Sequence, residues 1–105
     1  MDSGTETFTS LFRIRKVFEN DQFGLYKIEG ALTSNNADSW ARELTRIIQC
    51  IDRPAVFDCA SLTNVNHEVT NILCNLIADK VYFLNLPMPA RNMLRSAGLG
   101  AMVLD

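Results

Sequence analysis

The hydrophobic pattern of this chain changes period along its length, and the order of those changes limits the folds it can adopt. Residues 8–18 and 23–30 alternate apolar and polar side chains, as half-exposed β-strands do. Residues 37–51, 67–79 and 89–97 instead repeat apolar side chains at helical spacing. Short apolar runs separate and follow these helices. The chain therefore predicts the order ββαβαβαβ.

This order predicts an α/β domain with a mixed, mostly parallel sheet and three main helices. The first two strands form an antiparallel hairpin at one side of the sheet. Residues 55–60 and 101–104 read as short strands. Residues 80–86, KVYFLNL, are almost continuously apolar, which predicts a strand buried on both faces. Residues 1–6 read as a disordered polar tail, so we place the domain at residues 7–105.

Charge and hydropathy exclude several classes of protein. The formal net charge is −2 and the basic residues are scattered, which argues against a nucleic-acid binder. The longest apolar runs are too short to cross a bilayer, and residues 1–10 do not resemble a signal peptide. We expect a cytoplasmic protein without direct membrane insertion.

The cysteine and histidine content gives no sign of a metal or redox centre. The three cysteines are Cys50, Cys59 and Cys74, an odd number without a CxxC pair, and His67 is the single histidine. A disulfide framework typically uses an even number of cysteines, and a metal site needs several Cys, His or carboxylate side chains at close spacing. We expect free thiols, no metal and no cofactor.

Two polar segments follow the second and third strands and precede helices. The carboxyl ends of parallel strands meet at one edge of a sheet, so both segments should lie together there. Asn66 is a candidate N-cap, and Glu68 would lie in the first helical turn, where the helix dipole favours an anion. The candidate partner-binding residues at this edge are Ser34, Asn35, Asn36, Asn66, His67, Glu68 and Asn71.

No catalytic constellation is evident at these positions. His67 and Glu68 are adjacent, and adjacent residues do not face each other on a helix. A nucleophile for His67 would have to come from Ser34, Ser61 or Cys59, and the spacing singles out none of them. We therefore predict a protein that is not an enzyme. Each of three conspicuous residues also has a non-functional interpretation. His67 can be an exposed residue without a role, Asp58 can be a carboxylate that shapes a loop, and Trp40 can be a core residue.

Four short motifs occur in an order that is typical of one family. They are Gly30-Ala31-Leu32, Val56-Phe57-Asp58, Phe83-Leu84-Asn85, and the segment from Pro89-Ala90 to Gly98-Leu99. On these motifs, the sequence from Leu25 to Asp105 resembles the STAS domain, which is named for sulfate transporters and anti-sigma factor antagonists. The resemblance implies a non-catalytic module that binds other proteins.

The resemblance fails at one important position. A gapless reading from Asp58 places Asn66 at the family's Asp and His67 at its phosphorylatable Ser or Thr. In antagonists of the family, phosphorylation of that hydroxyl expels the partner by adding negative charge. Thr63 and Thr70 lie nearby at different helical phases and are weak substitutes. The resemblance therefore implies a STAS module whose phosphorylation switch is lost, with Glu68 as a permanent charge nearby.

Two classes of partner remain open. The first is a kinase-like anti-sigma factor or another signalling protein, which this chain would regulate as an antagonist does. The second is the ATPase of an ABC-type lipid transporter, on which a STAS-like accessory subunit would dock. The sequence also leaves open whether the chain forms a homodimer.

Overall fold

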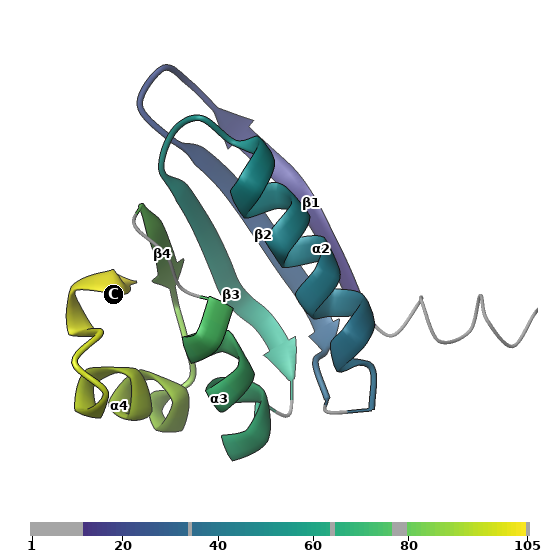
Figure 1. Ribbon diagram of the computed structural model, residues 1–105, viewed down its shortest axis with the longest axis vertical. Helices are drawn as coiled ribbons and strands as arrows, with labels where there is room; N and C mark the ends of the chain where they lie inside the picture. Colours follow the sequence, from purple (N-terminus) through teal and green to yellow (C-terminus); the bar gives the residue numbers. More distant parts are fainter. Residues whose placement is uncertain (1–11, 34, 64, 77–79, 105) are drawn as a thin grey trace, which may run out of the picture.

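The computed structural model describes residues 12–33, 35–63, 65–76 and 80–104, and contains one five-stranded sheet with three helices in these ranges (Figure 1). The strand order is β1-β2-β3-β4-β5. The β1–β2 pair is antiparallel and the other pairs are parallel. This confirms the predicted α/β order. The elements are β1 (Phe12–Glu19), β2 (Gly24–Ala31), α2 (Ala37–Cys50), β3 (Ala55–Thr63), α3 (His67–Leu76), β4 (Val81–Leu84), α4 (Met88–Ser96), the 3₁₀ turn η1 (Gly100–Met102) and β5 (Val103–Leu104).

The helices share one face of the sheet. Each strand–helix–strand unit steps in the same direction across the sheet, from β2 to β3, β4 and β5. Because such crossovers are right-handed, helices that connect strands in one direction must lie on the same side. Figure 1 views the molecule from that side, with α2 lying across β1 and β2. None of these helices is long and apolar enough to cross a bilayer.

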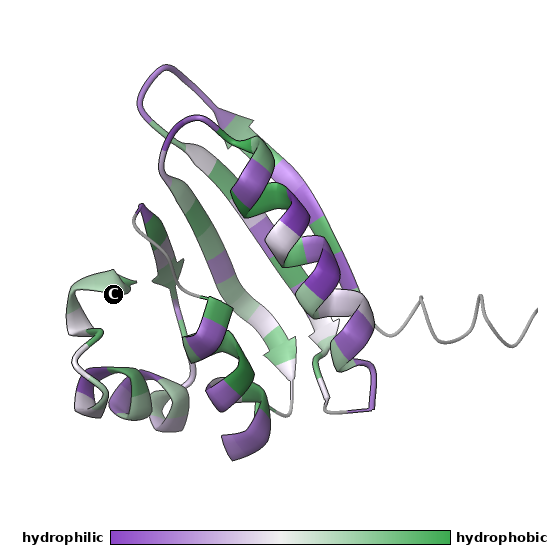
Figure 2. Ribbon diagram, in the orientation of Figure 1, coloured by the Kyte–Doolittle hydropathy of each residue, from purple (hydrophilic) through white to green (hydrophobic). Residues whose placement is uncertain are grey.

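The core fills the space between the helices and the covered face. Ile28, Phe57 and Phe83 supply it from the strands and are at most 2% exposed. The amphipathic helices add Trp40 and Leu73, while their polar sides face outward (Figure 2). Burial of apolar surface on this scale is the main stabilising term in a domain of this size.

The prediction that β4 is buried on both faces was wrong. Val81 and Phe83 are buried, but Tyr82 and Leu84 point to the opposite face and are only half-buried. Within the described ranges no helix packs on that opposite face, because every crossover runs over the other one. A continuous apolar run therefore has one covered face and one accessible face.

The ends of β3 and α4 have separate structural causes. β3 is three residues longer than predicted and ends at Thr63, because Thr63 still pairs with Ala31 of β2. The end of α4 follows the prediction: Gly98 has φ +82°, and the Leu99 N–H donates to the Leu94 carbonyl at 2.9 Å. The predicted start of the first strand at Phe8 and the predicted end of α3 near Asp79 lie outside the described residues.

Candidate functional site

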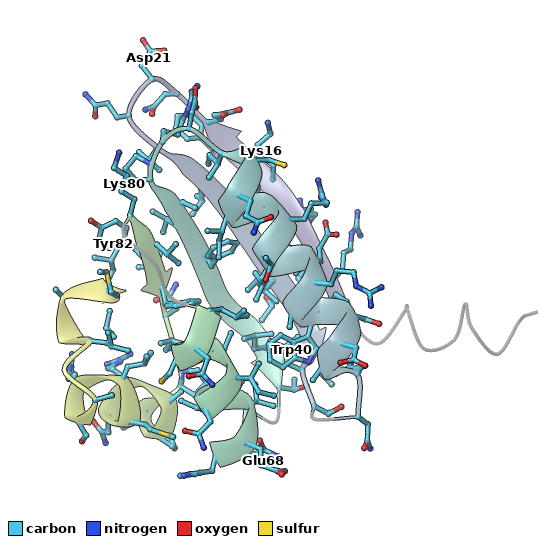
Figure 3. The ribbon with its side chains drawn as sticks, in the orientation of Figure 1. Lys16, Asp21, Trp40, Glu68, Lys80 and Tyr82 are labelled. Carbon is cyan, nitrogen blue, oxygen red and sulfur yellow. The ribbon has the colours of Figure 1, made fainter. Side chains whose placement is uncertain are left out.

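The two predicted polar segments lie at the same edge of the sheet. β2 and β3 end side by side, because Ala31 pairs with Thr63, and each strand is followed by a loop that enters a helix. Both loops lie at the lower end of the sheet in Figure 1. In Figure 3, Glu68 is at this end and Asp21, at the tip of the β1–β2 hairpin, is at the opposite end. We call this lower end the carboxyl edge.

The first turn of α3 presents polar side chains to solvent. The Asn66 Oδ1 accepts the Val69 N–H at 2.9 Å, so Asn66 caps the helix as predicted. His67 and Glu68 form the first helical positions and are exposed, and Asn71 is exposed one turn later. These side chains project away from the core. They are therefore available to another molecule.

The loop before α2 uses its asparagines differently. Asn35 is exposed, whereas Asn36 is only 8% exposed. The Asn36 Oδ1 accepts the Thr33 N–H at 2.8 Å, and its Nδ2 donates to the Ala31 carbonyl at 3.0 Å. Asn36 thus acts from inside the loop by holding its shape. Ser34 lies outside the described residues.

The buried indole of Trp40 fixes the same loop from the helix side. Its Nε1–H donates to the Thr33 carbonyl at 2.9 Å, and the side chain is 0% exposed. Because a buried indole N–H needs a hydrogen-bond partner, the loop can occupy few other positions without losing this bond. The structural role that we considered for Trp40 is confirmed.

The two threonines near His67 differ in accessibility. Thr70 is 2% exposed, and its hydroxyl donates to the Asn66 carbonyl at 2.9 Å. Thr63 is exposed at the end of β3, and its hydroxyl donates to the Gly30 carbonyl at 3.3 Å. A kinase would have to unfold the start of α3 to reach Thr70, whereas Thr63 is reachable from solvent.

A groove beside His67 was not predicted from the sequence. It has a volume of about 330 Å³ and lies between the starts of α3 and α4. Its lining residues are Val65, Asn66, His67, Thr70, Pro89 and Met93. Met88, 58% exposed, stands at the start of α4. The Met88-Pro89 pair reads in sequence only as a helix start, and nothing local indicates that α4 begins beside α3.

Asp58 has a structural role, in agreement with its interpretation as a carboxylate that shapes a loop. Its Oδ1 accepts the Ala60 N–H at 3.0 Å and the Asn85 Nδ2–H at 3.1 Å. Asn85 has φ +62°, in the left-handed region that asparagine tolerates better than most residues. Asp58 therefore holds the turn that leads from β4 toward α4.

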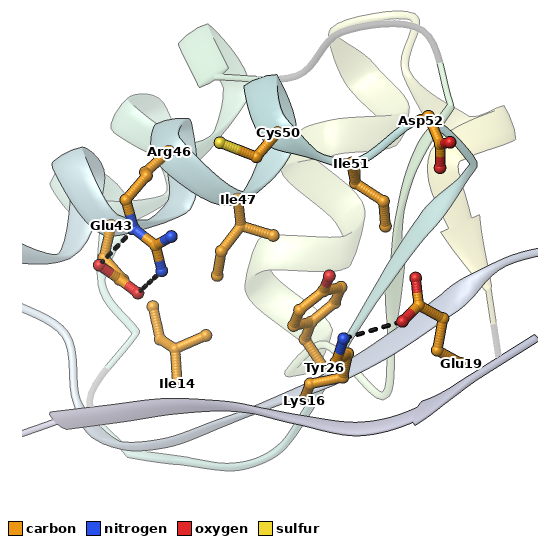
Figure 4. Close-up of a pocket in the computed structure, with 10 residues that line it drawn as sticks. All are labelled: Ile14, Lys16, Glu19, Tyr26, Glu43, Arg46, Ile47, Cys50, Ile51 and Asp52. Carbon is orange, nitrogen blue, oxygen red and sulfur yellow. Dashed lines mark hydrogen bonds and ion pairs between the residues drawn. The ribbon is translucent and has the colours of Figure 1, made fainter.

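A second hollow, of about 370 Å³, lies between α2 and the β1–β2 hairpin, away from the carboxyl edge (Figure 4). Its floor is apolar and includes Tyr26. Its charges are paired within the rim: Lys16 donates to Glu19 at 2.8 Å, and Arg46 pairs with Glu43. The hydrogen bond from Arg46 lowers the pKa of Glu43. Because Lys16 and Arg46 are already paired, the charges around this hollow do not indicate a particular ligand.

The described residues also contain no group of three or more His, Cys, Asp or Glu side chains that could hold a metal ion. Burial raises the pKa of the Cys59 thiol to about 12, and burial also raises the pKa of Cys74. Such thiols are mostly protonated at neutral pH and are poor nucleophiles. The described carboxyl edge offers hydrogen-bonding side chains such as His67 and Asn71 beside the groove.

Comparison with known proteins gives a result at the level of the fold. No protein-family model matches the sequence, and no curated protein matches it. Twelve chains of solved structures match, among them three that each match over most of both chains. An anti-sigma factor antagonist from Mycobacterium paratuberculosis has a TM-score of 0.63 and 11% identity, covering 87% of this chain and 83% of its own.

The other two structures are of SpoIIAA. The phosphorylated form of this Bacillus cell fate determinant has a TM-score of 0.64 and 14% identity, covering 89% of this chain and 90% of its own. The unphosphorylated form of the anti-sigma factor antagonist SpoIIAA has a TM-score of 0.57 and 12% identity, covering 89% and 87%. At this level of identity the likeness establishes the fold, and it confirms the resemblance found in the sequence motifs.

Proposed function

Because the chain has the STAS fold of the anti-sigma factor antagonists, we propose that it is a non-catalytic regulatory module that binds another protein through its carboxyl edge. The observation that carries this proposal is the start of α3, where exposed His67 lines an apolar groove of about 330 Å³ and the neighbouring Glu68 is exposed to solvent. A groove that accepts an apolar side chain, bordered by polar groups that fix orientation, suits protein recognition.

We further propose that this module lacks the Ser/Thr phosphorylation switch. His67 occupies the acceptor position, and the nearest hydroxyl in α3, that of Thr70, is buried and hydrogen bonded. Glu68 supplies a single fixed negative charge at the helix N-terminus, where the helix dipole stabilises it. Binding would therefore be governed by the amounts of the two proteins, in the cytoplasm, without covalent modification of this chain.

The partner that fits this proposal best is a kinase-like anti-sigma factor or a related signalling protein. The same absence of a switch also fits a constitutive subunit, such as an accessory protein on the ATPase of an ABC-type transporter. Identifying the captured protein distinguishes the two partners.

The binding proposal is tested by affinity capture from the cells that express this protein. We expect the wild-type chain to retain a specific ATPase, and Glu68→Lys to weaken that capture by about tenfold or more, because it reverses a charge at the interface. Asp21→Lys is the matched control, since it makes the same charge change at the opposite end of the sheet (Figure 3).

The two variants also define the outcome that would contradict the proposal. Equal loss of capture by Glu68→Lys and Asp21→Lys would indicate a general charge effect and no specific surface at the carboxyl edge. Circular dichroism and thermal unfolding of both variants provide the folding control. A metal-dependent or catalytic activity of the purified chain that Glu68→Lys removes would replace a binding role by an enzymatic one.

The absence of a switch is tested by mass spectrometry of the protein isolated from growing cells. We expect residues 63–70 to be unmodified in a major fraction of the molecules. Stoichiometric phosphate on Thr63 or Thr70 would contradict this part of the proposal. Incubation of the purified chain with the captured ATPase and ATP repeats the measurement in vitro. Thr63→Val is the control, because the Thr63 hydroxyl is exposed and the Thr70 hydroxyl is buried.

A further inference from the structure

The face of the sheet opposite the helices carries an apolar row that crosses four strands. Phe18 pairs with Leu25, Leu25 with Val56, and Val56 with Tyr82, so their side chains lie in one line on this face. Phe18 is 49% exposed, and the other three are half-buried. No described helix covers this row. An accessible apolar row of this length is typical of an interaction surface.

The row borders a hollow with a volume of about 600 Å³. The hollow is lined by Gln22, Phe23, Leu25, Pro54, Val56, Tyr82, Leu84 and Leu104. Phe18 stands beside it on the outer strand β1, with its ring 5.8 Å from that of Phe23. A projecting aromatic side chain and a hollow of suitable size are thus present on the same surface. A surface with both features can bind a copy of itself.

The next row on this face is charged. Arg15 pairs with Lys27, and Lys27 pairs with Asp58, so the charges change sign between β1 and β3. Arg15 is also 3.4 Å from Glu29, and both are partly exposed. The basic outer strand and the acidic Asp58 lie equally far from β2 on either side, so Arg15 can face Asp58 of a second copy, whereas Lys27 on β2 would face its own counterpart.

From these features we propose that the face opposite the helices binds a second copy of this chain. A two-fold axis that runs parallel to the strands over β2 exchanges β1 with β3. It places Phe18 of each copy over Val56 of the other, in the hollow, and Arg15 over Asp58. Such an isologous contact is self-complementary and closes as a dimer. This inference goes beyond the proposed function, because it uses the face away from the carboxyl edge.

The size of the face sets the expected strength. Strands of up to nine residues, spaced about 4.8 Å apart, give a face on the order of 500 Å² in projection. Stable interfaces bury about 800 Å² of accessible surface per partner. The face is thus smaller than a standard stable interface, and we expect a weak dimer. The dimer should depend on concentration in a measurable range.

The test is analytical ultracentrifugation of the full chain over a series of concentrations. We expect the mass to rise from 11.8 kDa toward twice that value. Phe18→Asp should raise the dissociation constant at least about tenfold, because it removes the projecting ring and buries a charge in the hollow. Met88→Asp is the matched control, since Met88 is similarly exposed but lies at the start of α4.

A second variant does not alter any buried apolar side chain. Arg15→Glu places a carboxylate over Asp58 of the other copy, and it should also weaken the dimer while leaving thermal unfolding almost unchanged. A chain that stays monomeric at every concentration overturns the proposal.

The two surfaces can be tested separately. Phe18→Asp should still capture the protein partner that the wild-type chain captures, and Glu68→Lys should still dimerise. A wild-type dimer that is unaffected by both Phe18→Asp and Arg15→Glu would overturn the assignment of this face to the second copy.

Discussion

Asn36 and Asn66 occupy equivalent positions, each directly before a helix, but they perform different tasks. Asn66 caps α3 with its side chain, whereas the Asn36 amide bonds back to Thr33 and Ala31 and makes no side-chain cap. Both uses are common for asparagine, and the sequence around them does not distinguish the two. Burial of Asn36 decides the matter, since a buried amide must satisfy its donors and acceptor within the loop.

At the residue scale, Cys59 provides a test of the core by pH. Burial raises the pKa of its thiol from the ordinary 9.0 to about 12, with a smaller effect from Asp58. The unfolded chain therefore loses this proton at lower pH than the folded chain. The resulting stabilisation is fully present below about pH 9 and is lost as the pH rises from about 9 to about 12.

This effect is measured by urea unfolding of the wild-type chain and Cys59→Ala at a series of pH values. The variant leaves a small cavity, which lowers its stability at neutral pH. We expect the difference in free energy of unfolding between the two to shrink above pH 9, since only the wild-type chain carries the titrating thiol. A difference that stays constant to pH 11 would mean that the thiol is accessible to water.

At the element scale, helical spacing identified the helices but not always their innermost residues. The spacing of residues 67–79 predicts an inner face of α3 with Val69, Ile72, Leu73 and Leu76; Val69 and Leu73 are buried there, while Ile72 and Leu76 are half-buried. The spacing of residues 37–51 predicts Ile48 on the inner face of α2, but Ile47 is buried and Ile48 is only half-buried. The apolar stripe identifies which face of a helix packs on the sheet. The orientation of the helix on the sheet then decides which residues of that face are most deeply buried.

The depth of α3 can be tested with one substitution and its neighbour. Leu73→Ala should lower the free energy of unfolding by ~2–5 kcal/mol, because Leu73 is 1% exposed and its loss leaves a cavity. Asn75→Ala, on the exposed side of the same helix, should change it by less than about 0.5 kcal/mol. Equal effects in chemical denaturation would mean that α3 packs on the sheet through a different face.

At the scale of the whole molecule, the direction of the crossovers separates two surfaces. All three described helices lie on one face, and their N-termini bring His67 and Glu68 to the carboxyl edge. The opposite face keeps its apolar row accessible. The two proposed interactions therefore use separate surfaces, the carboxyl edge for a regulatory partner and the opposite face for a second copy.

Local sequence determined the element order, the α3 cap at Asn66 and the Gly98 helix end, because these depend on neighbouring residues and on hydrophobic period. Tertiary structure decided the rest. The groove beside His67 needs the start of α4, more than 20 residues later in the chain, to lie beside the start of α3. The accessible side of β4 follows from the side on which every helix crosses. Neither fact is encoded in a local pattern, since both depend on how distant segments pack.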